Sequence, residues 1–182
     1  SQVLVIGLDA TAPGAEQTGI DFHPGDAKRL LILGDDAAAP AVCSILEQLP
    51  THAAEVEAVV EVPQLARKIE AGPDGHWTDS RGNRINIRWQ ERLGERGDRL
   101  AEAIEDHLHR FPLPRCQQDS PEEGPDDLLW DTPASPPQEF YSWIAGKSTM
   151  VRRLRRILVN DHGVDRRHIA FMSYWRHGSA GM

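Results

Sequence analysis

Five short apolar segments alternate with helical stretches, and this alternation restricts the fold more than any other feature of the chain. The strand-like segments are residues 29–33, 56–62, 84–89, 139–144 and 167–174. The first of them is apolar almost throughout, which is typical of a strand buried on both faces of a parallel sheet. Apolar residues with helical spacing occur in 42–50, 98–109 and 150–159, and more weakly in 64–70. The pattern predicts an α/β fold, a parallel five-stranded sheet with helices on both faces.

The length and the local composition predict one domain with an arm and a long loop. The chain has 182 residues, of which 40% are hydrophobic, enough for one core. Residues 1–27 are rich in turn-forming residues and are predicted to be an arm or linker, so the domain spans 28–182. Within it, residues 112–137 contain seven prolines and six acidic residues, a composition typical of a loop.

The distribution of charge separates an acidic body from a basic carboxyl-terminal segment. The whole chain carries 20 Lys and Arg residues and 28 Asp and Glu residues, a net charge of −8. Residues 138–182 instead hold eight basic and three acidic residues. Because an acidic chain binds nucleic acid poorly, no nucleic-acid partner is expected. The basic segment favours a small anionic ligand, or else it is the solvated face of an arginine-rich helix.

Three features predict a cytoplasmic protein without a membrane span. No apolar run approaches the roughly 20 residues that a membrane helix needs. Residues 1–7 have neither the basic region nor the long apolar region of a signal peptide. Cys43 and Cys116 are expected to be free thiols in a reducing compartment. No spacing of histidine and cysteine resembles a zinc site, so no metal ligands are expected.

Two turns that follow strands are candidate ligand sites, because ligands of open α/β sheets bind beyond the carboxyl ends of the strands. The first is Gly34-Asp-Asp-Ala-Ala-Ala-Pro40, where small residues precede a helix N-terminus suited to a phosphate. Asp35 and Asp36 would repel a phosphate unless they point away, and they could instead cap the helix. The second turn is Ala145-Gly-Lys-Ser148, which adds a cation; alternatively, it is an ordinary turn capped by its serine.

The end of the last strand is the third candidate. Tyr174 and Trp175 offer flat rings for a ligand ring system, and Arg176 offers a positive charge. The alternative is that one aromatic ring closes the core and Arg176 is solvated. No set of residues is predicted to be catalytic, since no Ser, His and Asp have a readable spacing.

Several ordered motifs lie between about Lys28 and Gly178. They are Leu33-Gly-Asp-Asp-Ala-Ala-Ala-Pro-Ala41, Leu46-Glu-Gln-Leu-Pro50, Val60-Glu-Val62, Arg88-Trp-Gln-Glu-Arg92, Trp143-Ile-Ala-Gly146, Val151-Arg-Arg-Leu-Arg-Arg-Ile-Leu158 and Tyr174-Trp-Arg-His-Gly178. In this order the motifs resemble the carboxyl-terminal domain of siderophore-interacting proteins, which are flavin-dependent ferric-siderophore reductases related to ferredoxin–NADP reductase. Two positions depart from the family: Lys147 stands where a glutamate is usual, and Ser173 stands where a glycine is usual.

The resemblance implies a Rossmann-like sheet of the ferredoxin–NADP reductase type and a module that binds NAD(P)H. It places the first and fourth strands side by side, so that Gly34 and Gly146 face one cleft. The implied cofactor-binding residues are Gly34, Asp35, Asp36, Ala37, Ala38, Arg92, Ala145, Gly146, Lys147, Tyr174, Trp175 and Arg176.

The same resemblance implies partners. FAD would be supplied by a flavin-binding domain missing from this sequence or present on another chain, because the 27 residues before Lys28 are too few for the family's flavin-binding barrel. The complete enzyme would act on a ferric siderophore in iron acquisition, and the domain alone would be inactive. The alternative is a stand-alone binding or regulatory domain with no redox activity.

Overall fold

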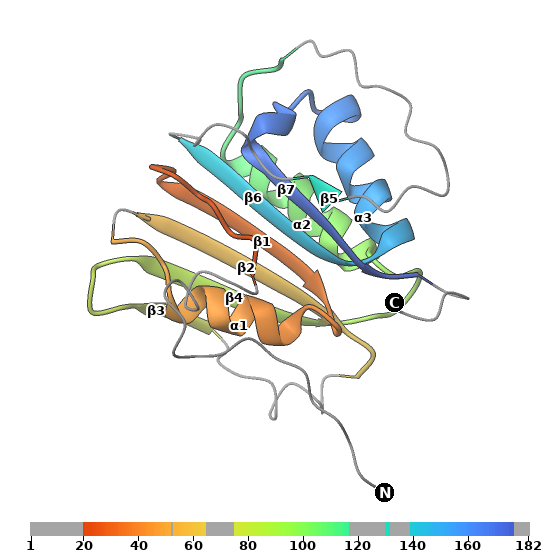
Figure 1. Ribbon diagram of the computed structural model, residues 1–182, viewed down its shortest axis with the longest axis horizontal. Helices are drawn as coiled ribbons and strands as arrows, with labels where there is room; N and C mark the ends of the chain where they lie inside the picture. Colours follow the sequence, from red (N-terminus) through yellow and green to blue (C-terminus); the bar gives the residue numbers. More distant parts are fainter. Residues whose placement is uncertain (1–19, 52, 65–74, 117–129, 132–138, 177–182) are drawn as a thin grey trace, which may run out of the picture.

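A computed structural model of the chain describes residues 20–51, 53–64, 75–116, 130–131 and 139–176. Within these residues lies a seven-stranded sheet with the order β3-β4-β2-β1-β6-β7-β5 (Figure 1). Its strands are β1 (Arg29–Asp35), β2 (Glu55–Val62), β3 (Gly75–Thr78), β4 (Arg84–Glu91), β5 (Trp130–Asp131), β6 (Phe140–Lys147) and β7 (Ile169–Trp175).

The five long strands are parallel, as the sequence predicts. β1 pairs with β2 on one side and with β6 on the other, and Gly34 lies opposite both Val60 and Ala145. If the five parallel strands are numbered 1 to 5 in chain order, they lie across the sheet in the order 3-2-1-4-5. The direction in which successive strands are added reverses between β1 and β6. In open α/β sheets this reversal is the place where ligands bind. The predicted adjacency of the first and fourth strands is therefore confirmed.

The prediction of a sheet with five strands is wrong in number, because two short antiparallel strands extend the edges. β3 pairs with the amino-terminal half of β4, and β5 pairs with β7. These strands have four and two residues, too few for a periodic pattern to reveal them. Packing rather than local sequence places them: Trp77 packs against the core, and the ring of Trp130 stacks on that of Tyr174.

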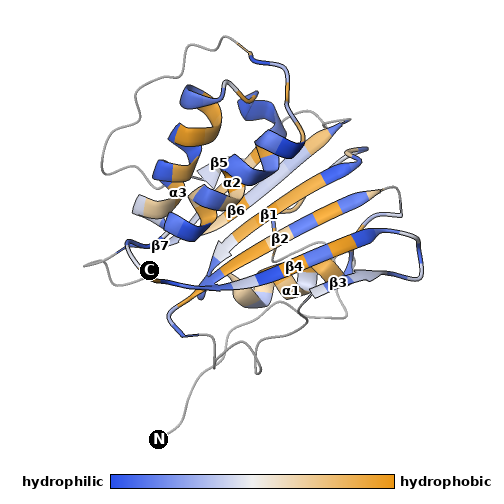
Figure 2. Cartoon of the chain, turned by 180° about the vertical axis from the view of Figure 1, so that it is seen from behind, coloured by the Kyte–Doolittle hydropathy of each residue, from blue (hydrophilic) through white to orange (hydrophobic). Residues whose placement is uncertain are grey.

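Helices cover both faces of the sheet, again as predicted. α1 (Ala39–Glu47) packs on one face through Val42, Ile45 and Leu46. α2 (Asp98–Arg110) and α3 (Ser148–Arg155) pack on the other face, and α3 continues as a wider π-helical turn, Arg156–Asp161. In Figure 2 the central strands are mostly orange, the colour of hydrophobic residues, whereas α2 and α3 carry blue bands on their outer sides.

Some predicted features lie outside the described residues. They are the helical stretch at 64–70, most of the arm at 1–27 and most of the acidic loop at 112–137.

The face of β2 and β4 that is turned toward α2 is unusually polar. Side chains alternate between the two faces of a strand, so Glu57 and Glu61 share this face of β2. Glu57 lies opposite Asn86 of β4, and Glu61 lies opposite Gln90. Glu57 and Glu61 are 4% and 0% exposed, so each buried charge needs partners. The partners that they find define two separate sites, one at each end of α2.

Candidate functional site

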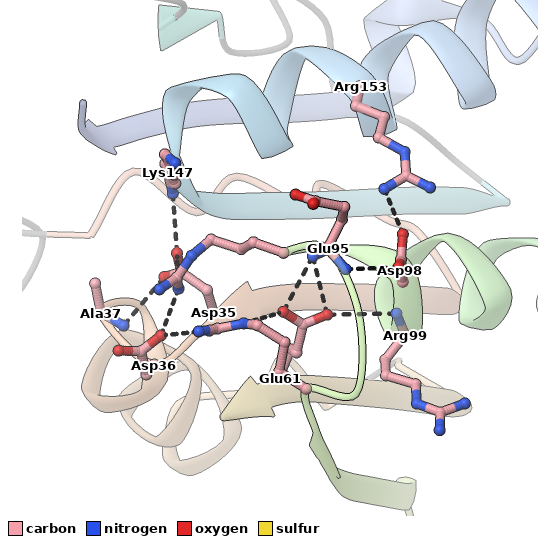
Figure 3. A network of polar contacts seen from close by, with 12 residues as sticks. Asp35, Asp36, Ala37, Glu61, Glu95, Asp98, Arg99, Lys147 and Arg153 are labelled. Atoms are coloured by element: carbon pink, nitrogen blue, oxygen red, sulfur yellow. Dashed lines mark hydrogen bonds and ion pairs between the residues drawn. The ribbon is translucent and has the colours of Figure 1, made fainter. Parts of the chain in front are cut away.

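The carboxyl ends of β1 and β6 meet at Asp35, the last residue of β1. Its buried carboxylate accepts hydrogen bonds from the backbone N–H of Ala37 and from that of Lys147, both at 3.0 Å (Figure 3). A third bond comes from Arg96 Nη1, at 2.9 Å. Asp35 thus ties the start of the α1 turn to the end of β6. The two turns proposed from the sequence are in direct contact.

Glycine is required at position 146 by this contact. Gly146 has a φ of +144°, which L side chains rarely adopt, and a Cβ atom there would lie 2.6 Å from Cγ of Asp35. Any side chain at this position would displace the carboxylate that joins the two turns.

Gly34 has a different role from the one its motif suggests. It lies within β1 rather than in the turn, and no positive φ is found there. A Cβ atom at Gly34 would lie 2.9 Å from Cβ of Ala38 and 3.3 Å from Cγ2 of Val42. Glycine is therefore needed so that α1 can pack closely on β1. We expect a larger residue here to lower stability rather than to block a ligand.

Arginines from the segment after β4 join the carboxylates of β1 and β2 into one network. Arg96 Nη1 pairs with Asp36 as well as with Asp35. Arg92 Nη2 lies 3.0 Å from Oδ1 of Asp36, and its Nε lies 2.8 Å from Oε1 of Glu61. Partial burial raises the pKa of Asp36, but the hydrogen bonds and positive charges of Arg96 and Arg92 outweigh it, so the pKa is lowered overall. The contacts of Asp36 with Arg92 and Arg96 are therefore ion pairs at neutral pH.

Glu61 occupies the N-terminus of α2. Its two carboxylate oxygens accept hydrogen bonds from the N–H of Gly97 at 3.0 and 2.9 Å, and one accepts from the N–H of Arg99 at 3.3 Å. Because the first amides of a helix have no partner within it and carry partial positive charge, a carboxylate here is favourable. This N-terminus is the kind of place where a phosphate binds in other proteins, but here the protein's own side chain fills it.

The ring of Trp175 lies among the cations of this edge. Arg96 Cζ is 5.0 Å and Lys147 Nζ is 5.6 Å from the ring centre, which are cation–π distances. The indole Nε1 is buried and has no hydrogen-bond partner among the described residues. Trp175 therefore lies beside the switch point between β1 and β6.

Tyr174 does not join this group. Its ring packs against Trp130 and Trp143 on the α1 face of the sheet, with ring centres 6.1 and 6.3 Å apart. Burial raises the pKa of its hydroxyl, with a smaller contribution from the charge of Asp21. Successive residues of a strand point to opposite faces, which separates Tyr174 from Trp175. Arg176 follows β7 and is exposed.

Comparison with known proteins identifies the family. The family model described as "Siderophore-interacting protein" matches residues 27–178, most of the chain. The chain belongs to the siderophore-interacting protein family. No curated protein is similar enough to count as a match.

Solved structures of siderophore-interacting proteins share the fold. The protein SipS from Aeromonas hydrophila is 23% identical with a TM-score of 0.55, and the match covers 86% of this chain and 49% of that one. The siderophore-interacting protein from Acinetobacter baumannii is 17% identical with a TM-score of 0.55, covering 88% and 51%. A siderophore utilization protein from T. fusca is 23% identical with a TM-score of 0.52, covering 86% and 48%. The present chain thus spans about half the length of these siderophore-interacting proteins.

The structure brings together most, but not all, of the residues predicted for the site of this family member. Residues of both turns, together with Arg92 and Trp175, lie along one edge, whereas Tyr174 faces away from it. Sequence reasoning missed Arg96 and assigned no role to Glu61. The signal for Glu61 was present, since a glutamate inside the apolar segment 56–62 needs a buried partner.

Two kinds of feature are absent from the part of the chain that the structure describes. They contain no group of three or more His, Cys, Asp or Glu residues that could hold a metal ion. No helix in the described part of the chain has the length and apolar character needed to cross a membrane.

Proposed function

We propose that this domain is the NAD(P)H-binding module of a flavin-dependent ferric-siderophore reductase, an oxidoreductase that takes part in iron release. A flavin-binding domain, on the same protein or on another chain, would complete it. The observation that carries the proposal is the contact between Asp35 and the Lys147 amide, which joins two strand-to-helix turns at the switch point of the sheet. Membership of the siderophore-interacting protein family supports the substrate class.

The residues at this edge fit a nucleotide through side chains rather than through helix N-termini. The first amides of α2 are bonded to Glu61, and that of Ala37 is bonded to Asp35. Lys147 has no carboxylate partner among the described residues, and its ammonium group lies over the Trp175 ring. Lys147 and the arginines would therefore hold the phosphates, and Trp175 would flank a ring.

The bound nucleotide would supply a hydride for a flavin. The part played by this chain is to bind and orient. The cations would fix the phosphates, and the partly buried Trp175 would exclude water from one side of the site. No residue of this chain is assigned a proton transfer.

A stand-alone binding or regulatory domain without redox activity is the second candidate, and one observation favours it. Three carboxylates, those of Asp35, Asp36 and Glu61, balance the positive charges of Arg92, Arg96 and Lys147 along the edge. A phosphate would have to compete with these carboxylates for the two arginines. If the competition favours the carboxylates, the edge is a structural network and not a nucleotide site.

Calorimetric titration with NADPH and with NADH at low salt distinguishes the two candidates. A charge-assisted contact with a phosphate is worth about 1.5–3 kcal/mol, so Lys147→Ala should weaken binding roughly tenfold or more. Lys28→Ala is the matched control, because that exposed lysine pairs with Glu139 before β6, away from the switch point. Binding to neither nucleotide, with or without an added flavin domain from a family member, would favour the second candidate.

A further inference from the structure

A polar cavity lies at the opposite end of α2, beside the amino-terminal halves of β2 and β4. Its volume is about 400 Å³, within the range of pockets that hold small molecules. Glu57 and Asn86 line it from these strands, and His76 of β3 lines it from the sheet edge. The last turn of α2 and the residue after it contribute His107, Arg110 and Phe111. The cavity shares no lining residue with the edge described above.

Glu57 is the centre of the charges around this cavity. Its carboxylate oxygens lie 2.6 Å from Arg88 Nη2, 2.5 Å from Arg110 Nη2 and 2.8 Å from His107 Nδ1. Burial raises the pKa of Glu57, but the contacts with His107 and Arg110 outweigh it and lower the pKa to about 2. One carboxylate thus faces two permanent positive charges. Arg110 lines the cavity, whereas Arg88 meets Glu57 from outside the lining. Because the rim pair of Arg84 and Glu55 is neutral, the five charged side chains together carry one excess positive charge.

Among the residues that line the cavity, two polar atoms lack hydrogen-bond partners. Nε2 of His107 and Oδ1 of Asn86 are buried and make no hydrogen bond with any described residue. His107 is 2% exposed, and its ring lies between those of Phe111 and Phe140. A carboxylate oxygen can only accept, so Nδ1 of His107 donates to Glu57. A hydroxyl group both donates and accepts, so it is the ligand group that suits Oδ1 of Asn86 and Nε2 of His107 alike.

We propose that this cavity binds a small polyhydroxylated carboxylate, such as a sugar acid. The carboxylate would meet the guanidinium group of Arg110, which lines the cavity, and would neutralise the excess charge. Hydroxyl groups would form hydrogen bonds with Nε2 of His107 and Oδ1 of Asn86, and a buried polar atom is costly when no partner meets it. The site is independent of the proposed nucleotide site, because the two lie at opposite ends of α2.

Three six-carbon probes test the carboxylate contact and the hydroxyl contacts separately. D-Gluconate carries both the carboxylate and the hydroxyls, hexanoate carries only the carboxylate, and sorbitol carries only the hydroxyls. Titration calorimetry of the whole chain at low salt should give a dissociation constant of about 1 mM or lower for gluconate. Hexanoate and sorbitol should each bind at least tenfold more weakly. No gluconate binding at about 10 mM, or equal binding of hexanoate, would overturn the proposal.

Substitutions of residues that line the cavity show which residue contacts the hydroxyls of the ligand and which contacts its carboxylate. Asn86→Ala should weaken gluconate about tenfold while hexanoate binding stays the same, because one acceptor of a hydroxyl is lost. Gln90→Ala is the matched control on the same face of β4, outside the cavity lining. Arg110→Gln should weaken gluconate and hexanoate alike. Unchanged gluconate affinity in Asn86→Ala, with an unaltered unfolding temperature, would contradict the assignment.

Amide chemical shifts locate the probe. Gluconate should shift the amides of the amino-terminal halves of β2 and β4 and of the last turn of α2. Shifts confined to Asp35, Gly146 and their neighbours would place the acid at the other edge and refute the cavity as its site.

Discussion

The two ends of α2 both rest on buried glutamates of β2, yet the two glutamates are neutralised in different ways. Glu61 meets the backbone amides at the helix N-terminus and one arginine, Arg92. Glu57 meets the other end of the helix, where the dipole is unfavourable to a negative charge, and it is surrounded by side-chain cations. At one end the helix itself contributes to the neutralisation, and at the other end only side chains do.

The two ends of α2 therefore offer a ligand different surroundings. At the N-terminus of α2 the carboxylate of Glu61 fills the position that an anion would take, so a ligand must displace it or bind beside it. At the C-terminal end the cations outnumber the carboxylate, and polar atoms without partners remain. The cavity beside Glu57 is therefore better prepared for a new small ligand than the N-terminus of α2.

Removing the charge of Glu57 should have the largest effect on stability. Glu57→Gln leaves Arg88 and Arg110 close together without their counter-charge. Glu57 is buried but the two arginines are partly exposed, so we expect a loss of about 3 kcal/mol, the low end of the range for a buried ion pair. Urea denaturation measures the change. Glu55→Gln is the control, because its exposed pair with Arg84 contributes about 0–1 kcal/mol. Equal losses in the two variants would contradict the central role of Glu57.

Acid should destabilise the protein through the same residue. The pKa of Glu57 is lowered from 4.5 to about 2 in the folded protein. A lowered pKa contributes stability that is fully present above pH 4.5 and is lost as the pH falls to about 2, about 3 kcal/mol in all. Unfolding measured at a series of pH values should show this loss in the native protein. Glu57→Gln should remove the part of this pH dependence of the unfolding free energy that Glu57 contributes. An unchanged pH dependence would exclude Glu57 as its source.

Adding a methyl group at Gly146 tests the contact that joins the two turns. Gly146→Ala combines an unfavourable φ with a clash against the Asp35 carboxylate, and we expect a loss of about 2–3 kcal/mol. Gly82→Ala is a matched control, since its φ is also positive but nothing lies within 4 Å of an added Cβ. That variant should lose about 1 kcal/mol from backbone strain alone. A similar loss in both would mean that Asp35 moves aside freely.

The charge of Glu61 should matter less than that of Glu57. Glu61→Gln keeps one oxygen for the amide of Gly97, and Arg92 retains Asp36 as a partner. We expect a loss of about 1–2 kcal/mol, typical of a weakened helix cap. Faster hydrogen exchange should be limited to the first turn of α2. Glu102→Gln, on the exposed surface of the same helix, should change little, and a larger effect than that of Glu57→Gln would reverse the comparison.

Much of the fold could be predicted from the sequence because the signals are local. The apolar run Arg29–Leu33 and the helical spacing in 98–109 each lie within one element, and each element was found. The helix predicted at 150–159 was also found, although its second half is a π-helical turn. The edge strands β3 and β5 were missed because short segments carry no period, and their pairing partners decide their structure.

The sites depended on contacts that no local pattern contains. Local motifs were enough to predict the alternation of strands and helices, the membership of the siderophore-interacting protein family, and the glycine-containing turns at the ends of the first and fourth parallel strands. The pairing of charges follows instead from the folded chain, since Asp35 pairs with Arg96, 61 residues away, and Glu57 with Arg110, 53 residues away. The fold also places Tyr174 and Trp175 on opposite faces of β7. Hydrophobic periodicity is set by neighbours along the chain, whereas buried charges are stabilised only by whatever partners the fold brings within reach.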